Sequence, residues 1–178
     1  LGLHNAAPPL FAFGTEEQRL RFLPPIVRNE ERWCQLFSEP GAGSDLASLS
    51  MKAELDGDEW VLSGQKVWST WAHHSEFAIC LARTDPDAPK RRGISYFLVD
   101  LRSPGVDIRE LRHMGGEVDF NEVWLDEVRV PAFHLVGQVH DGWRVAGATL
   151  ASERQMVAGS GSGGVDRIGG SGADRLLA

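Results

Sequence analysis

The stretch that decides the fold is SMKAELDGDEWVLSG, residues 50–64. Apolar and polar side chains alternate from Ser50 to Leu55, as they do on a strand with one buried face. Asp56-Gly57-Asp58 is typical of a tight turn, and Trp60-Val61-Leu62 then resumes the strand pattern. The stretch therefore predicts a β-hairpin.

After this hairpin, short apolar runs separated by turn signals continue for about seventy residues. Further strands are predicted at Phe77–Arg83, Tyr96–Asp100, Val106–Leu111 and Phe120–Val130. Glycine and proline turn signals separate these runs, and no helical periodicity lies between them. Short strands at this spacing indicate an antiparallel barrel or sandwich and argue against a βαβ fold.

Both ends of the chain are predicted to be helical. Thr15-Glu16-Glu17-Gln18 is a capping-box pattern, and it opens a short helix that Pro24-Pro25 ends or kinks. Near the other end, Val145–Ala158 loses the strand alternation and indicates a helix. The run from Ala158 to Gly172 contains seven glycines, which suits either a flexible linker or two closely packed helices.

Composition excludes several classes of function. The chain has 178 residues, 42% apolar and 24% charged, with a formal charge of -7, so a basic face for nucleic acid is not expected. Cys34 and Cys80 stand far apart in apolar runs, which suits buried free thiols and a cytoplasmic location. No apolar run is long enough to span a bilayer, and no signal peptide is recognisable. We expect the chain to be a segment of a longer protein.

Two segments suggest a ligand site, although each has an ordinary alternative. SEPGAGSD, Ser38–Asp45, resembles a phosphate-binding loop, but Leu46 occupies the third glycine position of a dinucleotide fingerprint and no Walker lysine follows. It is therefore either a turn or an anion-binding nest of backbone N–H groups. Trp68 and Thr70 lie two residues apart, which on a strand places an aromatic ring beside a hydroxyl. That pair suits a flat heteroaromatic ligand, or a core tryptophan with a solvated threonine.

The remaining candidates concern acid–base and metal chemistry. Glu153-Arg154 is either a general base beside an arginine or a solvated pair. The six histidines lack metal-binding spacing, so no metal is predicted. Gly159–Gly163 matches the sequence pattern of a nucleophile elbow. No predicted strand precedes it, so a serine hydrolase is not indicated.

Taken in order, several segments together resemble the acyl-CoA dehydrogenase family of flavoproteins. The matching runs are FSEPGAGSD (37–45), LSGQKVWST (62–70), LARTDP (81–86), GISYFLVD (93–100), PGV (104–106), FNEVWLDEVRVP (120–131) and GW (142–143). The resemblance implies an α+β chain in which an antiparallel β-barrel middle domain is flanked by helical segments. The implied boundaries are 1–32 for the end of an N-terminal helical domain, 33–139 for the middle domain and 140–178 for the start of a C-terminal helical domain.

The same resemblance implies a cofactor, FAD, and the residues that bind it. Phe37 and Ser38 would contact the pyrimidine edge of the flavin, and Gly43 and Ser44 would lie near a pyrophosphate of FAD or of acyl-CoA. Trp68 would lie beside the isoalloxazine ring, where Thr70 would bond its N5 and O4 region. Leu36 and Ser69, which flank these residues, complete the expected cofactor set. Trp71 replaces a smaller residue of many members and is expected to alter the rim of the site.

The implied reaction is α,β-dehydrogenation of an acyl-CoA thioester. A glutamate removes the α-proton while the β-hydride passes to the flavin. Glu153 matches the position of the base in isovaleryl-CoA and long-chain members, and Arg154 matches an arginine near the substrate. The base could instead lie beyond Ala178, as in most members. Expected partners are an acyl-CoA substrate, electron-transfer flavoprotein and further copies of the chain in a tetramer or dimer. Alternatives are a flavin monooxygenase or nitroalkane oxidase on the same scaffold, or a non-catalytic subunit of a heteromeric dehydrogenase.

Overall fold

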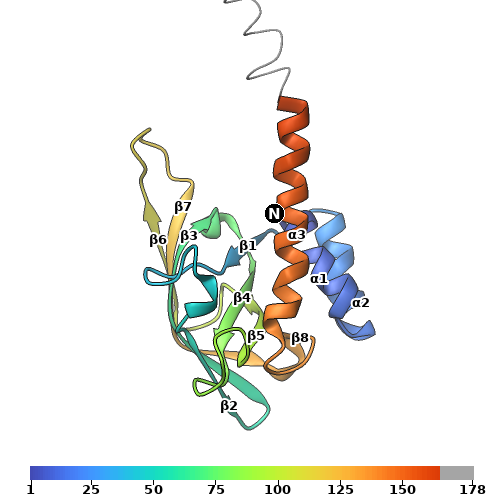
Figure 1. The fold of residues 1–178 in the computed structure, drawn as a ribbon, viewed down its shortest axis with the longest axis vertical. Helices are drawn as coiled ribbons and strands as arrows, with labels where there is room; N and C mark the ends of the chain where they lie inside the picture. Colours follow the sequence, from blue (N-terminus) through green and yellow to red (C-terminus); the bar gives the residue numbers. More distant parts are fainter. Residues whose placement is uncertain (165–178) are drawn as a thin grey trace, which may run out of the picture.

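A computed structural model describes residues 1–164 of the chain (Figure 1). Helices gather on one side of the molecule and a sheet forms the other side. The helices are α1 (Ala7–Phe13), α2 (Glu16–Val27) and α3 (Gly142–Gly164), with a single π-helical turn, η1 (Gly2–Ala6), before α1. This arrangement confirms the predicted α+β class.

The sheet has eight strands. They are β1 (Trp33–Leu36), β2 (Lys52–Asp56), β3 (Glu59–Thr70), β4 (Phe77–Arg83), β5 (Ile94–Asp100), β6 (Val106–Leu111), β7 (Phe120–Pro131) and β8 (Leu135–Val136). Seven follow the order β6-β7-β3-β2-β4-β5-β8, and β1 joins β4 off this path. Over the described residues the path does not close on itself, so the middle of the chain is an open curved sheet and not a strict barrel.

The predicted hairpin is present, with its turn in the predicted place. Asp56 pairs with Glu59, which leaves Gly57 and Asp58 as a two-residue loop. Gly57 has a φ of 65°, a left-handed value that glycine adopts without a Cβ penalty. The other four predicted strands are also present, with ends shifted by at most two residues.

Two pairings differ from the antiparallel prediction, because β1 and β2 both run parallel to β4. Strand β1 runs parallel to β4, with Trp33 opposite Phe77 and Leu36 opposite Cys80. Between β1 and β4 the chain runs through the β2–β3 hairpin and two short 3₁₀ turns, η2 (Leu46–Ser48) and η3 (Ala72–His74), and not through an α-helix. Strand β1 was not predicted, because four residues are too few to show an alternation.

Strand β4 is buried on both faces, which explains its continuous apolar sequence FAICLA. Phe77, Ile79 and Leu81 pack in a cluster that includes residues of all three helices. Ala78 and Cys80, which point the other way, pack in a second cluster inside the curved sheet. The two cysteines of the chain are buried free thiols, as the sequence predicted.

The capping box at the start of α2 forms as predicted. The Gln18 N–H donates to Thr15 Oγ1 at 3.2 Å, and the Thr15 N–H donates to Gln18 Oε1 at 2.9 Å. Gln18 Nε2 also donates to the carbonyls of Phe133 and Leu135, so the same side chain ties the helix to β8. The helix continues through Pro24-Pro25 and ends at Val27. No helix within residues 1–164 is both long and apolar enough to cross a membrane.

Candidate functional site

A cavity of about 190 Å³ lies where β1, β3 and the N-terminal segment meet. Its lining residues are Leu1, Asn5, Gln35, Phe37, Ser38, Val67, Trp68 and Thr70. Four of the residues predicted to bind a cofactor are therefore brought together, although thirty positions separate Ser38 from Trp68. The cavity is smaller than the roughly 300–1,000 Å³ typical of a whole ligand pocket, so it suits one ring system of a larger molecule.

The end of β3 is shaped by a β-bulge. The pairing of β3 with β7 shifts register between Lys66 and Ser69, and Trp68 has a φ of 60°. A bulge turns a side chain out of the regular alternation. Trp68 is accordingly 63% exposed, and its ring meets Phe120 edge-on at 5.9 Å. The exposed indole and the Thr70 side chain line the same cavity, as their spacing predicted.

The opposite wall, Phe37-Ser38, is bonded directly to β3. The Val67 N–H donates to the Ser38 carbonyl at 2.9 Å, and Lys66 Nζ donates to the Phe37 carbonyl at 3.0 Å. Both carbonyls are thus engaged with β3. The Ser38 N–H donates to no protein acceptor in the described part of the chain, and it is therefore free to bond a ligand.

Behind this wall lies an ion pair that is almost fully buried. Lys66 Nζ contacts Glu39 Oε1 at 2.9 Å, with the two side chains 0% and 6% exposed. Glu39 also accepts bonds from the N–H groups of Ser50 and Met51. Burial alone would raise the pKa of the Glu39 carboxyl, but the Lys66 ammonium and the backbone donors outweigh burial and hold that pKa below its usual 4.5.

The rest of the glycine-containing loop is open to solvent. Glu39 and Ala42 exchange two backbone hydrogen bonds of 3.0 Å, which makes a tight turn at Pro40-Gly41. Neither Gly41 nor Gly43 has a left-handed φ, so the backbone conformation does not require glycine there. A Cβ on either residue would meet no atom within 4 Å. The glycines therefore leave free space beside the backbone.

Like Gly43, three further predicted cofactor residues do not line this cavity. Ser44 lies in the exposed part of the loop beside Gly43. Leu36 is fully buried in the sheet core. Ser69 is also buried, and its Oγ has no partner among the described residues. Ser69 follows the bulge and alternates with Trp68 and Thr70, so its side chain lies on the buried face of β3.

The candidate base and its neighbour lie on α3. Thr149 Oγ1 donates to the Asn5 carbonyl at 3.2 Å and contacts the Tyr96 hydroxyl at 3.0 Å. Because Asn5 lines the cavity, these bonds tie α3 to the cavity wall. Glu153 follows Thr149 by one helical turn, and its side chain lies outside the described part of the structure. Arg154 is exposed.

Sequence reasoning missed two polar residues of the cavity. Asn5 Nδ2 donates to Gln35 Oε1 at 3.0 Å, and Asn5 is only 5% exposed. Asn5 sits in the π-helical turn η1, a local geometry that is frequent at functional sites. The available signal was Gln35, an amide inside the otherwise apolar run Trp33–Phe37.

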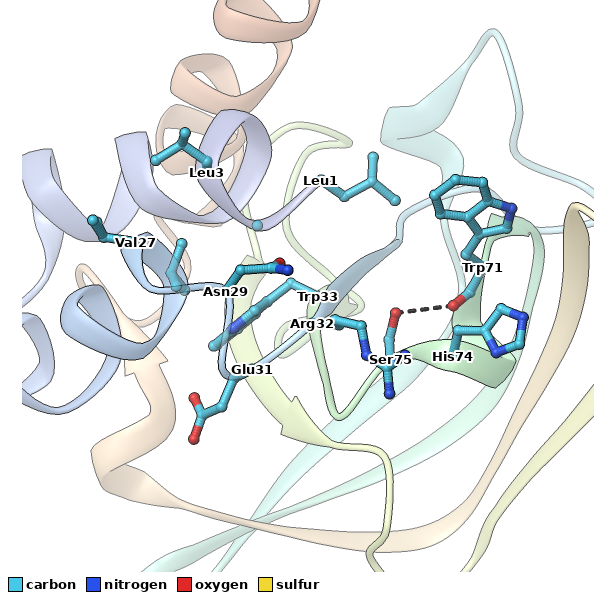
Figure 2. A pocket seen from close by; sticks show the side chains of 12 residues that line it. Leu1, Leu3, Val27, Asn29, Glu31, Arg32, Trp33, Trp71, His74 and Ser75 are labelled. Carbon is cyan, nitrogen blue, oxygen red and sulfur yellow. Dashed lines mark hydrogen bonds between the residues drawn. The ribbon is translucent and has the colours of Figure 1, made fainter.

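A second cavity, of about 370 Å³, lies next to the first (Figure 2). Its lining includes Arg32 and Trp33, at the start of β1, and Trp71, His74 and Ser75 from the segment between β3 and β4. Trp71 therefore belongs to this neighbouring cavity and not to the one with Trp68. Its carbonyl accepts a bond from Ser75 Oγ at 2.9 Å, drawn as a dashed line in Figure 2. Leu1 lines both cavities.

His113, Glu117 and Asp119 gather at the end of the β6–β7 hairpin. Their potential ligand atoms lie within 4.8 Å of one another. His113 Nε2 is 3.2 Å from Asp119 and 3.9 Å from Glu117. A hydrogen bond between the His113 ring and the Asp119 carboxylate holds two of these three groups together.

These features define a class: an α+β protein in which a largely antiparallel sheet, packed on helices, forms the wall of a cavity with an exposed tryptophan and a hydroxyl. Comparison with known proteins narrows the class. The family model described as "Acyl-CoA dehydrogenase, middle domain" matches residues 34–128, more than half of the chain. The chain belongs to the acyl-CoA dehydrogenase family.

Two relatives from Mycobacterium tuberculosis show how close the similarity is. The chain is 58% identical to acyl-CoA dehydrogenase FadE34 over 86% of its own length and 22% of that protein. It is 54% identical to acyl-CoA dehydrogenase IpdE1 over 83% of its length and 38% of that protein. The chain thus spans well under half the length of these relatives.

A solved structure shares the fold. It is a variant of the Tcur3481-Tcur3483 steroid acyl-CoA dehydrogenase, with a TM-score of 0.82 and 36% sequence identity. The match covers 85% of this chain and 40% of that one.

Proposed function

We propose that the protein containing this chain catalyses FAD-dependent α,β-dehydrogenation of an acyl-CoA thioester. The observation that carries the proposal is the cavity in which Phe37 and Ser38 face Trp68 and Thr70. Membership of the acyl-CoA dehydrogenase family supports both the reaction and the cofactor.

The residues present fit a flavin. The exposed Trp68 indole offers an apolar face to a flat ring. The Ser38 N–H is a free donor, and the Thr70 hydroxyl makes no protein hydrogen bond within the described residues. Space beside Gly41 and Gly43 would let a phosphate approach the backbone. Ser44, which adjoins this space, would bind a pyrophosphate of FAD or of the acyl-CoA.

Each side chain would have a distinct part in the reaction. FAD, when bound, supplies the acceptor for the substrate β-hydride. Glu153 removes the α-proton from the thioester as a general base. Thr70 donates a hydrogen bond where negative charge develops, and Trp68 keeps water off one face of the site. Arg154 contacts the substrate.

The partners follow from the same proposal. An acyl-CoA is the substrate, electron-transfer flavoprotein takes the electrons away, and copies of the protein associate as a tetramer or dimer. Residues 1–32, 33–139 and 140–178 would belong to the N-terminal, middle and C-terminal domains of the intact protein.

Anaerobic reduction tests this function. The intact protein is loaded with FAD and mixed with straight-chain, branched and steroid acyl-CoA thioesters, and flavin absorbance is followed. We expect at least one thioester to bleach the flavin and Glu153→Gln to lose turnover while retaining FAD. Glu54→Gln, at an exposed position of β2, is the matched control and should react normally. Flavin that stays oxidised with every thioester would contradict the proposal, and undiminished turnover of Glu153→Gln would remove that residue from the mechanism.

A further inference from the structure

The buried ion pair of Lys66 and Glu39 stands behind the cavity wall and not in it. Lys66 precedes Trp68 by two residues on β3, and Glu39 directly follows Ser38. The pair therefore connects the two segments that form opposite walls of the cavity. Lysine is almost never fully buried, yet Lys66 is 0% exposed.

Stability alone gives a weak reason for such a pair. Removing two charges from water carries a desolvation penalty, and apolar residues of similar volume often stabilise a fold as well or better. A buried pair with every bond satisfied does fix geometry, because each group has one low-energy arrangement. Lys66 bonds both Glu39 and the Phe37 carbonyl, while Glu39 is held in turn by Ser50 and Met51.

The bond to the Phe37 carbonyl has a directional consequence. In a trans peptide the C=O and the following N–H point in opposite directions, and the described chain contains no cis peptide. Since Lys66 draws the Phe37 carbonyl toward β3, the Ser38 N–H is turned away from the lysine. Val67 holds the next carbonyl, that of Ser38, on the β3 side as well. Two consecutive carbonyls are thus held by donors of β3.

We propose that Lys66 and Glu39 are positioning residues that aim the Ser38 N–H at the ligand and fix the spacing between Phe37-Ser38 and Trp68–Thr70. The inference rests on the proposed function, because it takes the ligand to be the flavin of FAD. Neither residue touches the ligand, so each acts through the backbone of Phe37 and Ser38.

The test uses the intact protein and the double variant Lys66→Met/Glu39→Gln, which removes both charges and leaves no buried charge unpaired. Lys52→Met, an exposed lysine on the neighbouring strand β2, is the matched control. Three quantities are measured: the dissociation constant for FAD, the absorption bands and reduction potential of bound FAD, and amide hydrogen exchange of the peptide that contains Phe37 and Ser38.

We expect the double variant to melt near the wild-type temperature but to bind FAD about tenfold more weakly, with shifted flavin bands and potential. Exchange in the Phe37-Ser38 peptide should be faster, while a β4 peptide and the Lys52→Met protein are unchanged. Wild-type affinity with wild-type bands would overturn the inference, as would unchanged exchange. If the unmodified protein failed to bind FAD, the proposed function would fail, and the exchange comparison would still report whether the pair fixes this segment.

A single variant covers the case in which the double variant does not fold. Glu39→Gln retains Lys66 but removes the carboxylate that holds its ammonium, so its folded fraction should bind FAD more weakly than wild type, by about threefold to tenfold. Wild-type affinity in folded Glu39→Gln protein would show that Glu39 is not a positioning residue.

Discussion

Two lysine–carboxylate ion pairs lie at the two ends of the same glycine-containing segment, and they differ in burial and in distance. Glu39 pairs with Lys66 at 2.9 Å in the interior, and Asp45 pairs with Lys90 at 2.6 Å on the surface. The surface pair is shorter, yet its side chains are 61% and 66% exposed. Water screens exposed charges, so breaking the surface pair should cost less stability than breaking the buried pair, which would leave a buried charge unpaired. Burial, and not distance, decides what each pair does.

The comparison also separates the two functions expected of the segment. At the Phe37–Glu39 end, hydrogen bonds and an ion pair to β3 fix the backbone in the absence of a ligand. Such a fixed backbone suits a site that must orient a rigid ring. The Gly43–Asp45 end is open, which suits contact with the phosphates of a longer molecule. The following variants test this division, in order of decreasing effect.

Replacing Lys66 with Met should have the largest effect. It leaves the Glu39 carboxylate buried without its partner, and breaking a buried pair in this way costs about 3–5 kcal/mol. Chemical denaturation of the Lys66→Met protein should show a loss of that size in the free energy of unfolding. A loss below about 1 kcal/mol is what breaking an exposed ion pair costs, and it would show that the two pairs do not differ as proposed.

Replacing Thr70 with Val should separate ligand binding from folding. The Thr70 side chain lines the cavity and bonds no protein atom among the described residues, so the free energy of unfolding should stay within about 0.5 kcal/mol of wild type. FAD should bind about tenfold more weakly, because one hydrogen bond to the ligand is lost. Isothermal titration and urea denaturation of the same preparation measure both. Unchanged affinity would exclude Thr70 from the flavin contact.

Acid should weaken the interior pair. The folded pKa of Glu39 lies below its usual 4.5, so its contribution to stability is complete above about pH 4.5 and is lost as the pH falls through the lowered value. The free energy of unfolding should therefore decline more steeply below about pH 4.5 in wild type than in Glu39→Gln. Hydrogen bonds from Lys90 and Ser48 also lower the pKa of Asp45, but Asp45→Asn should flatten the decline less because that carboxylate is exposed. Equal slopes for the three proteins would contradict this.

Replacing Lys90 with Met should have the smallest effect. Exposed ion pairs typically contribute between zero and about 1 kcal/mol, and salt reduces that further. The unfolding free energy of Lys90→Met should match wild type in about 0.5 M salt. A loss comparable to that of Lys66→Met would show that the open end of the segment is held more firmly than its exposure indicates.

Much of the fold was predictable, because its main signals are local. The hairpin at 50–64 carries both alternation and a turn, and Thr15 and Gln18 form a capping box from four consecutive residues. Strand β1 was missed because four residues show no period and its pairing with β4 is non-local. That the sheet does not close into a barrel likewise depends on pairings between strands that are far apart in the sequence.

The candidate site was predictable only in part. Trp68 and Thr70 were found through their spacing, and Ser38 through the motif that contains it. The Trp68 bulge, and the burial of Ser69 that accompanies it, follow from the register between β3 and β7, which the sequence does not display. Asn5 joined the site through a tertiary contact with Gln35, thirty residues away. The ion pair between Lys66 and Glu39 was not predicted either, because it too is a tertiary contact between residues far apart in the sequence.

A structure of the intact protein with bound FAD tests the central claim most directly, because it locates the flavin without reference to activity. The account predicts the isoalloxazine ring in the cavity between Ser38 and Trp68, with the Ser38 N–H and the Thr70 hydroxyl bonded to it. A flavin ring found in the neighbouring cavity of Trp33, Trp71 and His74, or away from the sheet altogether, would contradict it.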